Sequence, residues 1–327
     1  MNARLEHGGI VTVLGGSGFV GRYVVRALAN DGWRVRAATR RPDLAGYLQP
    51  MGVVGQIHAV QANIRYPDSV RRAVEGADAV VNLVGVLFNS RPQTFQSVHV
   101  AGARAAAKAA KDAGVKTFVH ISAIGADRKS PGRYGRTKAA GEVAVLCEFP
   151  EAVILRPSLI FGPEDQLFNR FAAMASMSPF LPLIGGGKTQ LQPVYAGDVG
   201  AAVAAAVRGD AKPRTIYELG GPEVISFRHL LDLVQEWSGR RRWYVPMPFW
   251  LAKAAALVTV PLPNAMRPIT VDQVRMLMQP NVVSDAAIKD GRTLPALGIH
   301  HPHTMENIVP AYLERFRRLG QFARYRG

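Results

Sequence analysis

Three side chains in the middle of the chain have the types and spacing of a proton-transfer site. Ser122 lies twelve residues before Tyr134, and Lys138 completes a Y-x-x-x-K pattern. Residues four apart on a helix share a face, so we expect the ammonium group to lower the phenol pKa from its ordinary value of about 10. Tyr134 would then protonate a carbonyl group during its reduction. Lys138 would also hold a ribose, and Ser122 would polarise the carbonyl oxygen.

A series of glycines near the N-terminus predicts a nucleotide-binding turn. The apolar run 10–14 is followed by Gly15, Gly18 and Gly21 in G-x-x-G-x-x-G order, and Gly16 adds an overlapping G-x-G-x-x-G. One glycine permits a tight turn at positive φ, one lets the backbone approach a pyrophosphate, and Gly21 lets the following helix pack closely on the strand. The start of that helix carries partial positive charge, which favours a phosphate group.

The end of the second predicted strand distinguishes the two nicotinamide dinucleotides. An acidic residue there accepts a hydrogen bond from a free 2′-hydroxyl, whereas arginine pairs with a 2′-phosphate. This chain has Arg40 and Arg41, and no carboxylate until Asp43. One arginine–phosphate bond contributes about 1.5 to 3 kcal/mol, so the sequence favours NADP over NAD. Arg22 either adds a third positive group or is a solvated helix residue, and Asn63 either accepts from the adenine amine or forms a plain turn.

Short apolar runs alternate with helical segments, and these elements must position the candidate residues. Strands are expected at 10–14, 34–39, 56–62, 79–84, 117–122 and 152–155. Helices are expected at 20–29, 67–75 and 94–113, and from about Tyr134. This order specifies an α/β fold with a doubly wound parallel Rossmann sheet, whose ligands bind at the carboxyl ends of the strands. After the fifth strand of such a sheet the Y-x-x-x-K pattern is specific, although it does not establish turnover.

Beyond residue 160 the alternation loosens, and we expect a smaller C-terminal α+β lobe. The predicted division is an NADP-binding Rossmann domain at 1–160 and a C-terminal lobe at 161–327. Within the lobe, 190–220 is expected to return to the Rossmann sheet, and 240–327 is expected to face a membrane or a partner. The Pro- and Gly-rich loop from Pro179 to Gly187 would help to choose a substrate, should there be one.

The composition describes a folded protein with an excess of positive charge. Of the 327 residues, 48% are hydrophobic, which suffices for a sizeable core. The 40 basic and 24 acidic residues give a formal charge of +16. This excess indicates an anionic partner, unless the arginines merely solubilise the surface. The single Cys147 excludes an internal disulfide, no metal site is predicted, and no apolar run is long enough to span a bilayer.

Six segments carry a resemblance to a known family: Leu14–Arg22, Val98–Gly102, Phe149–Ser158, Ile160–Asp165, Thr270–Arg275 and Asn281–Ser284. Over nearly its whole length the chain resembles the short-chain dehydrogenase/reductase superfamily, in its extended or atypical branch. Within that branch it is similar to the nucleotide-holding accessory subunits of respiratory complex I, the family of NADH dehydrogenase alpha-subcomplex subunit nine. The last two segments are the most diagnostic, because general reductases have no reason to share them.

This resemblance implies NADPH held tightly at the junction of the peripheral and membrane arms, with no established turnover. It places Pro157 along the cofactor, together with several of the motif residues. The predicted cofactor contacts are then Gly15, Gly16, Ser17, Gly18, Phe19, Val20, Gly21, Arg22, Arg40, Arg41, Asn63, Val84, Gly85, Ser122, Tyr134, Lys138, Arg156 and Pro157. Because Ser122, Tyr134 and Lys138 are all retained, the site is either catalytic or vestigial.

Two basic and aromatic segments predict a surface that meets a membrane or a partner. The run Arg240–Tyr244 precedes the apolar stretch 245–261, which ends before Pro263 and is too short to span a bilayer. It suits an interfacial helix with Phe249 and Trp250 at headgroup depth, or equally a buried helix. Near the C-terminus basic and aromatic residues interleave: Arg315, Phe316, Arg317, Arg318, Phe322, Arg324, Tyr325 and Arg326. Nucleic acid ranks low, because no nucleic-acid module is recognisable.

The sequence therefore predicts an NADPH-holding accessory subunit of complex I that stabilises or assembles the arm junction. Its expected partners are core subunits near the quinone site and the membrane arm, together with the lipid surface. We expect a peripheral location on the cytoplasmic face of a bacterial inner membrane, or on the matrix side in a mitochondrion. The first nine residues show no signal or transit peptide, which favours the bacterial setting. The alternative is an active NADP-dependent short-chain reductase or nucleotide-sugar epimerase.

Overall fold

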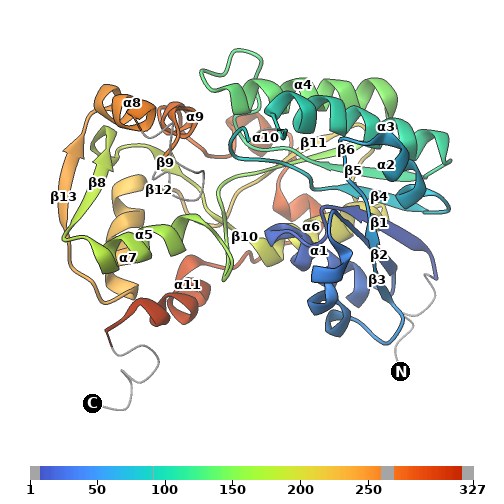
Figure 1. Ribbon diagram of the computed structural model, residues 1–327, viewed down its shortest axis with the longest axis horizontal. Helices are drawn as coiled ribbons and strands as arrows, with labels where there is room; N and C mark the ends of the chain where they lie inside the picture. Colours follow the sequence, from blue (N-terminus) through green and yellow to red (C-terminus); the bar gives the residue numbers. More distant parts are fainter. Residues whose placement is uncertain (1–7, 91, 259–268, 319–327) are drawn as a thin grey trace. The chain divides into compact units, whose positions relative to one another are not determined.

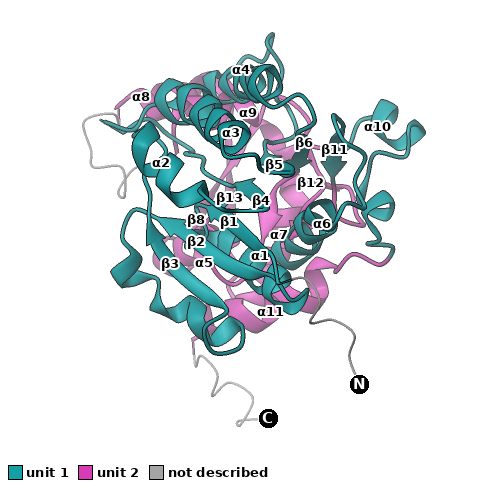
Figure 2. Cartoon of the chain, turned by 90° about the vertical axis from the view of Figure 1, so that its right-hand side faces the viewer, with its two compact units in different colours: residues 1–157, 196–219, 283–300 teal, residues 158–195, 220–282, 301–327 magenta. Residues whose placement is uncertain are grey.

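The chain folds into two compact units, each assembled from separate stretches of sequence. The computed structural model describes residues 8–90, 92–258 and 269–318 (Figure 1). Unit 1 comprises residues 1–157, 196–219 and 283–300, and unit 2 comprises residues 158–195, 220–282 and 301–327 (Figure 2).

Unit 1 is built on a seven-stranded parallel sheet with the strand order β11-β6-β5-β4-β1-β2-β3. The strands are β1 (Ile10–Leu14), β2 (Arg34–Thr39), β3 (Ile57–Gln61), β4 (Ala79–Asn82), β5 (Thr117–Ile121), β6 (Val153–Pro157) and β11 (Ile216–Leu219). Val13 and Val80 are fully buried, as expected for strands covered on both faces. The strand order reverses between β1 and β4, where open α/β sheets bind their ligands. The predicted α/β fold with a doubly wound parallel Rossmann sheet is confirmed.

Helices cover both faces of this sheet. α1 (Phe19–Asn30) and α6 (Ala196–Arg208) pack together on one face, and α2 (Pro67–Val74), α3 (Ala103–Asp112) and α4 (Arg133–Glu148) lie on the other (Figure 1). A π-helix, η4 (Gln96–Gly102), leads into α3. The short helices η2 (Pro42–Leu44) and η3 (Gly46–Met51) follow β2, and α10 (Asp285–Lys289) and η7 (Leu294–Leu297) belong to the last stretch of unit 1. Buried alanines such as Ala106 and Ala110 let α3 lie close to its neighbours.

The described residues of unit 2 form three short two-stranded sheets in place of one large sheet. β7 (Ile160–Phe161) pairs with β10 (Val194–Tyr195), β8 (Phe180–Ile184) with β13 (Trp243–Met247), and β9 (Gln190–Leu191) with β12 (Ile225–Ser226). Its helices are α5 (Leu167–Met177), α7 (Phe227–Trp237), α8 (Phe249–Val258), α9 (Val271–Met276) and α11 (Met305–Leu313), with the 3₁₀ turns η5 (Gly185–Gly187) and η8 (Glu314–Phe316). A separate core that includes the buried Phe168, Phe227 and Leu230 holds these elements together.

The stretch 190–220 is divided between the two units. β11 joins the Rossmann sheet and α6 covers it, whereas β9 and β10 pair within unit 2. Residues 283–300, which the sequence pattern assigned to the C-terminal lobe, belong to unit 1. There, Ile124 packs with Val283 and Ala287 in a small apolar cluster.

Candidate functional site

β1 leads directly into a turn whose glycines have distinct roles. Gly15 has a φ of +85°, in the left-handed region that favours glycine. A Cβ atom at Gly21 would lie 2.4 Å from the carbonyl oxygen of Gly15, so glycine is needed for α1 to start this close to β1. Gly18 is the N-cap residue of α1, and no side chain in the described structure caps this helix. The first N–H groups of α1 therefore remain available for a phosphate group.

A pocket of about 510 Å³ opens at the end of β2, lined by Ser17, Thr39, Arg40, Arg41, Leu44 and Tyr47. The hydroxyl oxygens of Ser17 and Thr39 lie 2.7 Å apart, and the Tyr47 hydroxyl donates to the Ser17 carbonyl at 2.6 Å. The Arg22 guanidinium lies 5.0 Å from the centre of the Tyr47 ring. Two arginines and three hydroxyl-bearing side chains thus line the pocket, which suits a phosphate ester.

The carboxyl ends of three further strands carry other predicted residues. Val84 and Gly85 follow β4, Ser122 follows β5, and Pro157 ends β6. Because parallel strands end at the same edge of the sheet, these residues share that edge with Gly15 and Arg40. Phe19 and Val20 form the first turn of α1 at the same edge.

Lys138 is buried beside the end of β5, where its ammonium group donates to the Ile121 carbonyl at 2.9 Å. A Cβ atom at Gly85 would lie 3.5 Å from Lys138 Nζ and 3.7 Å from His99 Nε2. Tyr134, on the first turn of α4, is half-buried. Its ring stands perpendicular to that of His99, with 5.3 Å between the ring centres. The structure therefore brings Gly85, Tyr134 and Lys138 together around a histidine.

His99 is the residue of this cluster that the sequence analysis missed. Its Nε2 accepts a hydrogen bond from the Val86 N–H at 3.1 Å, and its Nδ1 lies 3.1 Å from Thr137 Oγ1. It occupies the middle of the π-helix η4, a rare geometry that often marks functional sites. A Cβ atom at Gly141 would lie 2.1 Å from the His99 carbonyl oxygen, so α4 packs directly on η4. The available signal was a lone histidine in an apolar stretch ahead of an alanine-rich helix.

Burial controls the ionisation of this cluster and corrects one expectation. Burial raises the pKa of Tyr134 to about 12, so the predicted lowering by Lys138 was wrong. Burial also lowers the pKa of Lys138 to about 8, against the opposing effect of Glu142. Burial and the charge of Lys138 lower the pKa of His99 to about 3, which keeps it neutral at pH 7. Removal from water disfavours each charged form.

On β5 and directly after it, His120 Nε2 and Ser122 Oγ are buried and have no hydrogen-bond partner within the described part of the chain. The other ring nitrogen of His120 lies 3.1 Å from the Asn82 side-chain nitrogen. A buried hydroxyl without a partner costs about 1 to 3 kcal/mol unless a ligand satisfies it. Together with the open start of α1 and the pocket at β2, the orphaned Ser122 hydroxyl fits a bound dinucleotide.

Two predicted contacts have partners of their own in the fold. The side-chain oxygen of Asn63 accepts from the Arg65 N–H at 3.2 Å, which is a turn geometry. Arg156 donates two hydrogen bonds, of 2.9 and 2.7 Å, to Glu142 and lies 3.7 Å from Glu218. The contact of either side chain with a nucleotide stays a prediction.

The predicted surface segment lies in unit 2, where α8 has one face buried and one exposed. Ala252 and Ala256 pack into unit 2, whereas Trp250 is 70% exposed. Phe249, expected at headgroup depth, packs against Gly185 instead, because Gly185 has no side chain to exclude its ring. No described helix is both long enough and apolar enough to cross a bilayer. Residues 259–263 and 319–327, including Phe322 to Arg326, lie outside the described residues.

Fold and family comparisons define the class of protein. Residues 11–220 match the NAD dependent epimerase/dehydratase family. The triphenylmethane reductase of Citrobacter sp. shares the fold with a TM-score of 0.73 at 19% identity, covering 93% of this chain and 99% of that one. The chain belongs to this family, the extended short-chain dehydrogenases/reductases.

Within that class, full-length similarity points to one group. The mitochondrial NADH dehydrogenase (ubiquinone) 1 alpha subcomplex subunit 9 of Arabidopsis thaliana is 35% identical over 95% of this chain and 79% of its own length. The chain is therefore a member of the subunit 9 family of complex I accessory subunits, and the predicted resemblance is confirmed. A ceramide reductase of Caulobacter vibrioides is also 35% identical, over 54% of this chain and 54% of that protein.

Proposed function

We propose that this protein holds NADPH in unit 1 as an accessory subunit of respiratory complex I. The observation that carries the proposal is the pairing of the uncapped α1 start with the Arg40–Arg41 pocket, in a chain of the subunit 9 family. The dinucleotide pyrophosphate would bind at α1, and the 2′-phosphate would bind in the pocket at β2. Ser122, Tyr134 and Lys138 would face the nicotinamide end.

The protonation states at the site support a role in which NADPH is bound over one in which it is used for catalysis. An efficient general acid has a pKa near the working pH, whereas burial raises the pKa of Tyr134 to about 12. Bound nucleotide would instead act on stability, because a ligand at one hundred times its Kd stabilises the folded state by about 2.7 kcal/mol. In this role NADPH stabilises unit 1 and does not deliver a hydride.

The proposed partners are core subunits of complex I near the quinone site and the membrane arm. The protein would stabilise or assemble that junction, peripherally attached on the cytoplasmic face of a bacterial inner membrane or on the matrix side in a mitochondrion. The mitochondrial relative and the surplus of basic residues support this placement.

The test is purification from solubilised membranes. We expect the protein to migrate with NADH:quinone oxidoreductase activity after mild detergent, with NADP(H) bound. A high-salt wash shortens the screening length to about 3 Å near 1 M, so attachment by exposed charges alone would be lost and a packed interface would persist. Recovery of the intact protein wholly in the soluble fraction, without complex I subunits, would refute the proposal.

A second candidate is an active NADP-dependent reductase or epimerase. The retained Ser122, Tyr134 and Lys138 favour it, as does the similarity to a ceramide reductase, a relative whose name describes reduction. Tyr134→Phe separates the two functions, because it deletes one hydroxyl and leaves the ring and Lys138 in place. A loss of NADPH-dependent reduction in cells whose complex I stays normal would establish the enzyme and exclude the purely structural role.

A further inference from the structure

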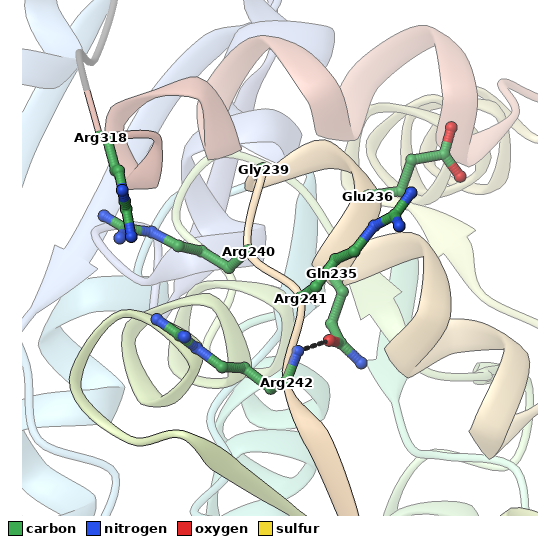
Figure 3. A pocket seen from close by; sticks show the side chains of 7 residues that line it. All are labelled: Gln235, Glu236, Gly239, Arg240, Arg241, Arg242 and Arg318. Atoms are coloured by element: carbon green, nitrogen blue, oxygen red, sulfur yellow. Dashed lines mark hydrogen bonds between the residues drawn. The ribbon is translucent and has the colours of Figure 1, made fainter.

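Four arginines of unit 2 line one pocket of about 500 Å³ (Figure 3). Arg240, Arg241 and Arg242 follow the C-terminus of α7, and Arg318 follows η8. All residues that line this pocket belong to unit 2, whereas the glycine turn and the Arg40–Arg41 pocket belong to unit 1.

Two of these guanidinium groups are held in place by the backbone. Arg240 Nε donates to the Phe316 carbonyl at 3.1 Å, and Arg242 Nε donates to the Ala175 carbonyl. The Arg242 main-chain N–H donates to the Gln235 side chain, which fixes the turn that carries the arginines (Figure 3). Among the described residues, the terminal amino groups of Arg240 and Arg242 make no hydrogen bond or ion pair. They are thus positioned in advance for a ligand, which lowers the entropy cost of binding.

The pocket has a strong excess of positive charge. Glu236 is the single carboxylate in its lining, against four arginines. In Figure 3 the guanidinium groups of Arg240, Arg242 and Arg318 lie on one side of the pocket, whereas Arg241 extends to the other side, beside Glu236. The negative end of α7 accounts for a cation at its C-terminus, but not for Arg318 from a distant segment. Guanidinium groups in such excess over carboxylates form a site for a phosphate group, which they bind through paired hydrogen bonds.

Exposed aromatic residues begin directly beyond the arginines. Trp243 is 77% exposed, and the parallel register of β13 and β8 places it beside Phe180, which is 53% exposed. Val245, two residues further along β13, is on the same face and 43% exposed. Tryptophan favours the boundary between water and lipid. The arginine pocket suits the phosphate headgroup of a phospholipid, and the exposed Trp243, Phe180 and Val245 suit its acyl chains.

We propose that the pocket of Arg240, Arg241, Arg242 and Arg318 binds the phosphate headgroup of an anionic phospholipid, with Trp243 and Phe180 against its acyl region. The proposal rests on the membrane-side role argued above and gives that role a specific lipid site. It is tested on the purified full chain, so its outcome is independent of copurification with complex I.

The experiment is sedimentation with vesicles of phosphatidylcholine, with or without phosphatidylglycerol. Each arginine near an anionic surface contributes about 1 kcal/mol, so Arg240→Gln with Arg318→Gln should weaken binding to the anionic vesicles about ten- to thirtyfold. The control pair Arg26→Gln with Arg72→Gln removes the same charge from exposed positions of unit 1 and should retain binding. Equal losses in both pairs, or no binding of the unmodified protein to anionic vesicles, would overturn the site.

Two further variants keep the test decisive. Arg318→Gln alone removes an exposed side chain with no hydrogen bond in the described structure, so it should fold and still weaken vesicle binding severalfold. Trp243→Ser should weaken vesicle binding while leaving any binding of inorganic pyrophosphate unchanged. If pyrophosphate displaced the protein from vesicles completely and Trp243→Ser had no effect, the ligand would be a soluble phosphate and the lipid assignment would fail. If the unmodified protein failed to bind anionic vesicles and still migrated with complex I, the lipid site would fail and the accessory role would stand.

Discussion

Two helices of unit 1 and two helices of unit 2 begin in different ways. In unit 1, α1 and α4 start after Gly18 and Gly132, and no side chain in the described structure caps either helix. In unit 2, the hydroxyl of Ser226 caps α7, and Thr270 and Gln273 form a capping box at α9. A helix capped by its own sequence needs no ligand, whereas an uncapped start leaves N–H groups for one. The comparison supports the proposed nucleotide site, because the starts of α1 and α4 leave N–H groups open for a ligand, whereas the starts of α7 and α9 are satisfied by their own side chains.

The largest effect should come from filling the space at Gly21. In Gly21→Ala, the new Cβ would lie 2.4 Å from one backbone oxygen and 2.6 Å from another, and neither can move without shifting the strand or the turn. We expect a loss of about 3 kcal/mol or more and no NADPH-dependent rise in melting temperature. Thermal unfolding with and without NADPH measures both.

The matched control for that variant is Gly46→Ala, where nothing lies within 4 Å of the added atom and φ is not positive. It should keep both stability and nucleotide binding. A stable, nucleotide-binding Gly21→Ala protein would show that α1 does not need this close approach.

The sequence predicted unit 1 well because its signals are local. The expected strand at 34–39 is β2, and the helix expected at 67–75 is α2, one residue shorter. In a parallel sheet all strands end at the same edge. Gly15 and Ser122 therefore both lie at the carboxyl edge, because each directly follows a strand. The remaining features of the candidate site, namely the position of His99 and the pKa of Tyr134, depend on three-dimensional surroundings. The position of His99 requires a π-helix, and the pKa of Tyr134 follows from its surroundings, which periodicity does not reveal.

Unit 2 was harder to predict because distant residues hold it together. β8 pairs with β13 through Phe180 and Trp243, and no short-range pattern links these two segments. The sequence analysis singled out the segment 281–284 only because it resembles the complex I accessory subunits. The structure supplies a reason, since the Asn281 side-chain oxygen accepts from Ser158 Oγ at 2.6 Å and from the Leu159 N–H at 3.0 Å.

The next largest effect should fall on nucleotide choice in unit 1. Arg40→Ala with Arg41→Ala removes two exposed positive groups from the pocket at β2, so the preference for NADP over NAD should fall about ten- to a hundredfold. Arg26→Ala with Arg72→Ala, away from that pocket, should leave the preference intact. Calorimetry measures both affinities, and equal affinities for NADP and NAD in the unmodified protein would contradict the assignment.

A smaller effect should appear as pH dependence of unit 1. Burial lowers the folded-state pKa of His99 from its ordinary value of 6.5 to about 3, so the unfolded chain binds more protons between these values. Stability is therefore full above about pH 6.5 and falls on acidification, by up to about 1.4 kcal/mol per pH unit. His99→Asn should reduce this slope between pH 6.5 and 5 in urea unfolding. The slope should not vanish, because burial also lowers the pKa of His120.

The control for the pH experiment is His58→Asn, at an exposed position of β3. It should leave the slope unchanged. If His99→Asn and the unmodified protein lost stability equally on acidification, the buried neutral state of His99 would be excluded.

The smallest effect should test the self-sufficiency of unit 2. Ser226→Ala removes the hydroxyl that accepts from the His229 N–H at 3.1 Å, so unfolding should become easier by about 1 kcal/mol. NADPH affinity should stay the same, because this cap belongs to unit 2 and the predicted nucleotide site to unit 1. Ser176→Ala provides the comparison, since its hydroxyl only donates back to the Ala172 carbonyl within α5 and its loss should change stability by less than about 0.5 kcal/mol. A change in NADPH affinity with Ser226→Ala would mean that the capped helices of unit 2 contribute to nucleotide binding, and the contrast between the units would then fail.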